Sequence, residues 1–351
     1  MAKPSPFGKE SRVKILKQHF AASKVTAGTA WQFIYRELLW IDGSTGLAHL
    51  YESDKAQRGR SKWFDRTIRF TELLCKGFGG ITKEELKSRI DRLFRACLQE
   101  LIEIKAKARG APKLPVELSD EEPDAAEEEP ADYVPDAELV EEFASLLVQR
   151  AAMPEAEALS LARDLVAKAR YFFTVERKRQ NVLGEGFEDL LQLLVLQVAR
   201  VPAKRVIIRK RADTLPGFHG TTTRDRVEAP DMAIVGRKNT DMLASIKWSL
   251  RHDRQKQLSD ELDCYVDLLS QKRFPRYILV TNEYDPGRLV NADGLARRGQ
   301  RIDCIYHINL DLLLRVLEDH PKARDLKPLI KAGRLRSLEE FLSDLKQAYG
   351  S

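Results

Sequence analysis

Two charged residues in the second half of the chain, Asp231 and Lys247, are of the types that hydrolyse phosphodiester bonds together with a metal ion. Asp231 follows Pro230 and opens an apolar run, and Lys247 lies near the end of the next apolar run. A carboxylate binds hard cations such as Mg²⁺, and an ammonium group orients or helps deprotonate a water that attacks phosphorus. The pair predicts metal-dependent phosphodiester hydrolysis, provided that the fold brings the two side chains together.

The two apolar runs are predicted to form a β-hairpin. PDMAIV and MLASIKWS flank GRKNTD, a polar connection containing Gly and Asn that is typical of a turn between half-buried strands. Alternation along the second strand places Ser245 and Lys247 on one face and turns Ile246 into the core. Glu261 follows Lys247 by fourteen positions, in a segment with helical apolar spacing. From the first turn of a helix packed on the sheet, Glu261 is predicted to reach the same metal.

The spacing of Ser245, Lys247 and Glu261 resembles that of the type II restriction endonucleases of the PD-(D/E)XK superfamily that recognise CCGG-type sites. In that branch a serine occupies the position two before the lysine, where an acidic residue is usual, and a downstream helical glutamate replaces it. The resemblance covers about residues 180–285. It implies an α/β fold, with a mixed sheet flanked by helices.

The same branch carries the run Lys-x-x-x-Arg-x-Asp-Arg, which this chain matches after Lys247 with Arg251, Asp253 and Arg254. Arginine can donate two hydrogen bonds to O6 and N7 of guanine, and aspartate can accept one from N4 of cytosine. A good bidentate contact contributes about 1–3 kcal/mol of discrimination against the wrong base. The resemblance implies that these three residues read a short palindromic site containing CCGG or a close relative such as CCNGG.

The metal is expected to be Mg²⁺, held by Asp231, Glu261 and the backbone carbonyl of Ile246. Lys247 would activate water, and the products would carry 5′-phosphate and 3′-hydroxyl ends. Ser245 belongs to this catalytic set as the residue in the usual acidic position.

A further carboxylate is often found on a preceding helix in such nucleases. GEGFEDLLQLLVLQV has helical apolar spacing, and its predicted buried stripe consists of Phe187, Leu190, Leu191, Leu194 and Val195. Glu188, directly after the phenylalanine, is the preferred candidate, and Glu185 is the reserve.

Each of these residues also has an ordinary structural interpretation. A glutamate in the first turn of a helix gains about 0.3–1 kcal/mol from the helix dipole without any metal. A lone lysine is usually a surface residue, and RHDR at residues 251–254 is typical of a solvated charge cluster. The functional interpretation is favoured because seven residues fall together at the spacing of the family.

Charge divides the chain into parts. Residues 114–149 contain thirteen acidic and no basic residues, so the net charge of +6 separates into −13 there and +19 over the rest, which suits a polyanionic partner. Residues 111–137 also contain five prolines, as is typical of a flexible linker. We expect a mainly helical N-terminal domain over residues 1–110, this acidic Pro-rich linker over 111–137, and the nuclease domain over 138–351.

The N-terminal domain contains three of the four tryptophans, Trp31, Trp40 and Trp63. Basic and aromatic residues alternate near the third, and they are Tyr51, Lys55, Arg58, Arg60, Lys62, Phe64, Arg66 and Arg69. Such a mixture can bind phosphates and stack on bases, as an accessory DNA-binding module, an effector site or an assembly module. Core packing of the tryptophans with surface arginines is an equally weighted alternative.

The remaining features predict a prokaryotic cytoplasmic protein. Cys75, Cys97, Cys264 and Cys304 have no metal-ligand spacing and are expected to be buried reduced thiols. The chain starts without an apolar signal region and has no membrane-spanning run, so no membrane association is expected.

Recognition of a palindrome requires two-fold related subunits, so a homodimer or higher homo-oligomer is expected on double-stranded DNA. A DNA methyltransferase acting on the same site is implied by the resemblance. Two alternatives stay open. A repair or other defence nuclease of the same fold would tolerate loss of Arg251 and Asp253, and a catalytically silent DNA-binding regulator would bind a site without cleaving it.

Overall fold

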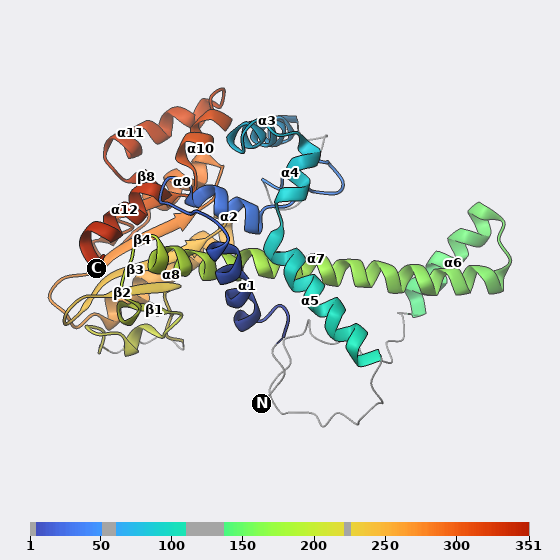
Figure 1. Cartoon of the computed structure of the whole chain (residues 1–351), viewed down its shortest axis with the longest axis horizontal. Helices are drawn as coiled ribbons and strands as arrows, with labels where there is room; N and C mark the ends of the chain where they lie inside the picture. The colour runs from blue at the N-terminus through green and yellow to red at the C-terminus, as the bar shows by residue number, and fades with distance from the viewer. Residues whose placement is uncertain (1–4, 51–60, 110–136, 221–225, 351) are drawn as a thin grey trace.

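The computed structural model describes residues 5–50, 61–109, 137–220 and 226–350 (Figure 1). The α-helices are α1 Lys9–Ala21, α2 Ala30–Leu38, α3 Ser61–Gly77, α4 Lys83–Arg89, α5 Arg92–Arg109, α6 Ala137–Ala151, α7 Glu155–Gln197, α8 His252–Leu268, α9 Pro286–Asp293, α10 Leu310–Val316, α11 Leu326–Lys331 and α12 Leu338–Tyr349. The 3₁₀ helices are η2 Ala203–Arg205, η3 Ala212–Thr214 and η4 Pro321–Asp325. The strands are β1 Val206–Ile208, β2 Met232–Val235, β3 Thr240–Lys247, β4 Arg276–Thr281, β5 Ala296–Arg297, β6 Gln300–Arg301, β7 Cys304–His307 and β8 Leu335–Ser337.

The protein is an α/β structure built on a mixed six-stranded sheet, as expected. Its strand order is β1-β2-β3-β4-β7-β8. The first three strands pair antiparallel, and β3, β4, β7 and β8 are parallel to one another. The hairpin predicted from the two apolar runs is confirmed, because β2 pairs with β3 and Met232 lies opposite Ala244. Strands β5 and β6 form a separate two-stranded ribbon.

Helices cover both faces of β3. Side-chain alternation turns Ile246 and Trp248 toward α7, where the rings of Trp248 and Phe187 lie 5.3 Å apart. Ser245 and Lys247 point to the opposite face, where Glu261 of α8 meets Tyr277 of β4. The expectation of half-buried strands is therefore wrong for β3, in which every residue except Asp241 is buried.

Helix α7 joins the sheet to the N-terminal helices. It has 43 residues, and the predicted stripe from Phe187 to Val195 is fully buried, so this prediction is confirmed. Helices α1, α2 and α5 pack on α7, and buried side chains from Ile15 to Cys97 belong to one hydrophobic core with those of the sheet. Residues 110–136, which hold nearly all of the expected linker, lie outside the described residues.

Two smaller expectations concern cysteines and membranes. The four cysteines are buried and free, as expected. Among the helices that the structure describes, none combines the length and apolar character needed to cross a bilayer.

The packing of α7 against the sheet can be tested with two leucines. Leu190 is fully buried, whereas Leu314 of α10 is 37% exposed. We expect Leu190→Ala to lower the free energy of unfolding by about 3–5 kcal/mol, since it leaves a cavity in the core. The matched Leu314→Ala should cost less than about 1 kcal/mol. Urea unfolding measures both, and similar losses in the two variants would contradict the position of α7.

Candidate active site

Asp231 and Lys247 form the centre of the site. Asp231 directly precedes β2, and the β2–β3 register brings it beside the end of β3. Its Oδ2 accepts hydrogen bonds from Lys247 Nζ at 2.7 Å and from the backbone N–H of Ile246 at 2.6 Å. The side chains of Asp231 and Lys247 are 13% and 6% exposed, so this ion pair is largely shielded from water. The predicted juxtaposition of the two chemical groups is therefore present in the fold.

Glu261 lies on the other side of Lys247. It is located in the third turn of α8, rather than in the first turn as expected, because the helix begins at His252. Its Oε1 is 3.7 Å from Lys247 Nζ, and its Oε2 accepts a hydrogen bond of 2.7 Å from the Tyr277 hydroxyl. The buried hydroxyl of Ser245 lies beside Glu261 and Tyr277, and within the described structure its oxygen makes no hydrogen bond of regular geometry.

Burial sets the protonation of this group. Burial raises the pKa of Glu261 to about 7, although Lys247 opposes the shift, and the neighbouring Asp231 raises the pKa further. Burial alone would lower the pKa of Lys247, but Asp231 and Glu261 outweigh it and raise that pKa. Lys247 therefore stays protonated near neutral pH, whereas Glu261 titrates there.

Glu188 of α7 lies at the edge of the same group. Its carboxylate pairs with Arg209 Nε at 2.5 Å. Burial and the neighbouring Asp231 raise the pKa of Glu188 to about 7, against the opposing charges of Arg209 and Lys247. The reserve candidate, Glu185, instead pairs with Arg12 of α1 at 2.6 Å. Glu188 is therefore the glutamate whose pKa responds to Asp231, whereas Glu185 is paired with Arg12. A metal-binding role for either glutamate stays a prediction.

Asp231 and Glu261 are the expected ligands of a magnesium ion, and this role stays a prediction. No cluster of three or more His, Cys, Asp or Glu side chains able to enclose a metal occurs within the residues the structure describes. Mg²⁺ commonly takes only one or two carboxylates, with waters and substrate phosphates completing its shell. In the structure the Lys247 ammonium lies between the two carboxylates, 2.7 Å from Asp231 and 3.7 Å from Glu261. The Ile246 carbonyl as a third ligand stays a prediction.

The proposed base readers lie at the start of α8, next to this group. Arg251 is the N-cap residue of α8, and its guanidinium is 3.4 Å from the Asp253 carboxylate. Arg254 lies 4.0 Å from Asp253 and donates a hydrogen bond to Gln257 at 3.2 Å. All three side chains are between 43% and 63% exposed, so their hydrogen-bonding groups can reach an external partner.

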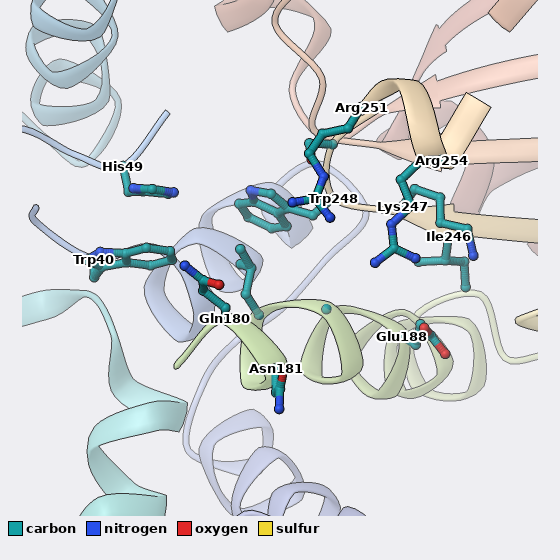
Figure 2. A pocket seen from close by; sticks show the side chains of 13 residues that line it. Trp40, His49, Gln180, Asn181, Glu188, Ile246, Lys247, Trp248, Arg251 and Arg254 are labelled. Carbon is teal, nitrogen blue, oxygen red and sulfur yellow. The ribbon is translucent and has the colours of Figure 1, made fainter. Parts of the chain in front are cut away.

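A pocket of about 300 Å³ connects the buried group with Arg251 and Arg254 (Figure 2). Glu188, Ile246 and Lys247 line one part of it. Its remaining lining residues are Trp40, His49, Gln180, Asn181, Leu183, Gly184, Trp248 and Ser249. Lys247 and Glu188 therefore share this pocket with Arg251 and Arg254, whereas Asp231, Glu261 and Asp253 do not line it.

Three positions of the site were not found from the sequence. Tyr277 donates to Glu261, and Arg209 pairs with Glu188 from a left-handed backbone conformation with φ of 48°. His49 stacks on Trp40 with ring centroids 3.9 Å apart, and burial lowers the pKa of His49 to about 4. Strand alternation offered a signal for Tyr277, but the pairing of β4 with β3 was needed to use it.

The structure places some of the aromatic and basic residues of the N-terminal region in the core and others at the surface. Trp40 is buried and Trp31 packs partly buried against the core, so core packing describes these two tryptophans. Arg66 lies over the Trp63 ring at 4.8 Å, and Arg69 pairs with Glu318 and Asp319. Of the other predicted members, Lys62 of α3 is exposed and Phe64 of α3 is half-buried. Tyr51, Lys55, Arg58 and Arg60 lie outside the described residues.

Comparison of the chain with protein-family models gives no matching family, and comparison with curated proteins gives no matching relative. The function is consequently inferred from the sequence pattern and the geometry of the site.

The raised pKa of Glu261 predicts how stability changes with pH. The folded state binds more protons than the unfolded state between about pH 4.5 and 7, so stability falls as the pH rises through that window. Glu261→Gln keeps an oxygen that can accept the Tyr277 hydrogen bond but does not titrate. In EDTA, we expect the variant to gain about 1–3 kcal/mol of unfolding free energy relative to the native chain between pH 4.5 and 8. Urea unfolding with a constant difference across that range would contradict the raised pKa.

Proposed function

We propose that this protein is a Mg²⁺-dependent type II restriction endonuclease with a PD-(D/E)XK core, which cleaves double-stranded DNA at a short palindrome containing CCGG or a close relative. The observation that carries the proposal is the buried contact of Lys247 with Asp231 and Glu261, residues far apart in sequence. The mixed sheet covered by helices agrees with the fold that the resemblance implies.

The residues divide the chemistry between them. Mg²⁺ held by Asp231 and Glu261 would supply positive charge against the phosphate that is cleaved. Lys247 keeps its proton beside these carboxylates, so its ammonium group orients the attacking water and adds to the charge that faces the phosphate. Burial and the neighbouring Asp231 raise the pKa of Glu188 to about 7, so Glu188 can take up or release a proton near neutral pH.

Ser245 has a physical reason to replace an acidic residue. It is fully buried beside Glu261, whose carboxylate already has its pKa raised by burial. A second carboxylate at position 245 would place another negative charge in the same dry space, which costs several kcal/mol unless a cation compensates it. Serine fills the position without this charge, and Glu261 supplies the ligand from α8.

Recognition is assigned to the start of α8. Arg251 and Arg254 line the same pocket as Lys247, so bases bound by them would lie near the phosphate that is cleaved. Both arginines contact Asp253, which holds the three side chains together for reading adjacent G·C pairs. The same proposal includes a homodimer or higher homo-oligomer on DNA, a methyltransferase for the same site, and a prokaryotic cytoplasm.

The alternatives are a repair or other defence nuclease of the same fold and a silent DNA-binding regulator. The first keeps the buried group but makes no use of Arg251 and Asp253 for site choice. The second requires no catalytic lysine, whereas Lys247 is held between two carboxylates at considerable desolvation cost. That cost favours an enzyme.

The catalytic role of Lys247 can be tested by substitution. We expect Lys247→Ala to reduce Mg²⁺-dependent cleavage of plasmid DNA by about 10²–10⁴-fold while DNA binding persists, because the group that orients water is lost. Lys238→Ala, at an exposed lysine in the β2–β3 turn, is the matched control and should retain its cleavage rate. Equal rates in the two variants would exclude Lys247 from catalysis.

Base reading predicts a change in discrimination rather than in affinity alone. Arg251→Ala should reduce the preference for a CCGG duplex over a duplex with one altered G·C pair by about 1–3 kcal/mol. Arg237→Ala, at an exposed arginine in the β2–β3 turn, should leave this preference unchanged. Competition binding at fixed salt measures both ratios. An equal loss of affinity for the two duplexes in Arg251→Ala would favour the nuclease that does not read sequence.

A further inference from the structure

Helices α6 and α7 form a hairpin that projects away from the sheet (Figure 1). Its inner seam is a hydrophobic cluster separate from the main core, with the buried residues Val140, Ala144, Ala158, Ala162 and Val166. These buried side chains are small, and the larger Leu147, Met153 and Leu159 that pack against them are only partly buried. A two-helix unit with such a thin seam gains stability when another surface covers it.

The hairpin exposes large hydrophobic side chains. Seven of the ten such side chains in the described part of the chain lie on α6 or α7. Five of these seven are Leu139 at 41%, Phe143 at 38%, Leu146 at 47%, Leu161 at 37% and Leu165 at 39% exposure. Exposed large apolar side chains that gather on one surface mark an interaction site.

These five side chains lie on one face of the hairpin. Phe143 precedes the seam residue Ala144 by one position, and Leu161 and Leu165 precede Ala162 and Val166 in the same way. One step along a helix turns a side chain by about 100°. Since α6 and α7 run antiparallel, the same step turns both rows to the same side. We call the face formed by these five residues the apolar face.

Charges at the two ends of the apolar face suit pairing with itself. On α7, Glu157 precedes Leu161 by four residues and Lys168 follows Leu165 by three, so both lie in line with the leucines and both are exposed. They are about 16 Å apart along the helix. If two hairpins pack face to face about a two-fold axis that lies between the faces and perpendicular to α7, each Glu157 meets Lys168 of the other copy. The charge pattern is thus self-complementary, as an isologous interface requires.

We propose that the apolar face is the surface through which two copies of this chain associate, with Glu157 of each copy opposite Lys168 of the other. This inference goes beyond the proposed function, because it assigns the assembly surface to a part of the molecule remote from the buried catalytic group.

The oligomeric state of the full chain in the absence of DNA tests the location of the interface. We expect sedimentation velocity to show a dimer for the native chain, and a monomer for Phe143→Glu combined with Leu165→Glu, with unchanged circular dichroism. Leu314→Glu, at an exposed leucine of α10, should remain a dimer. A native chain that stays monomeric up to tens of micromolar, or a dimer that the double variant leaves intact, would overturn the proposal.

Charge reversal tests the two-fold arrangement without disturbing the apolar face. Glu157→Lys and Lys168→Glu should each raise the dimer dissociation constant by about tenfold, since each places two repelling pairs in the interface. The combined reversal restores both pairs and should restore the native value. Absence of this restoration would overturn the pairing. Lys247→Ala should dimerise normally, so failure of the proposed catalysis would not be confused with failure of the interface.

Discussion

The hydrogen-bonded register between β2 and β3 is the constraint on which the candidate site depends. It fixes Asp231, just before β2, against the end of β3, where one carboxylate oxygen binds both the Ile246 N–H and the Lys247 ammonium. A shift of the register by one residue would turn Lys247 to the opposite face of the sheet, toward α7. The parallel pairing of β3 with β4 then brings Tyr277 to the same face, where it orients Glu261.

Burial raises the pKa values of the glutamates around Lys247, and it also costs free energy because charged groups are removed from water. Two carboxylates and an ammonium share a space that is nearly closed to water, and both Glu188 and Glu261 have pKa values raised to about 7. Groups poised near neutral pH in a pocket are characteristic of functional sites. The same pocket extends to Arg251 and Arg254, so a ligand that enters it contacts candidate catalytic and recognition groups together.

Sequence patterns predicted the parts of the site that are local. The hairpin, the helix that carries Glu261 and the buried stripe from Phe187 to Val195 followed from periodicity and turn composition. Contacts that depend on tertiary pairing were missed, as with Tyr277 on β4 and Arg209 beyond β1. The start of α8 at His252 was also missed, because polar residues precede its apolar stripe and hid its first two turns. That α7 is one helix of 43 residues was not predicted, since the sequence pattern identified only the part around Phe187 to Val195.

The most direct test of the central claim is to sequence the ends of the fragments that the purified protein releases from a CpG-rich plasmid in Mg²⁺. The buried group and the arginines beside it predict discrete fragments whose 5′-phosphorylated ends fall at one CCGG-containing sequence. Plasmid that remains uncut over a range of metal and salt concentrations would contradict the assignment of Asp231, Lys247 and Glu261 as a catalytic centre. Ends scattered without a common sequence would retain catalysis and contradict base reading by Arg251, Asp253 and Arg254.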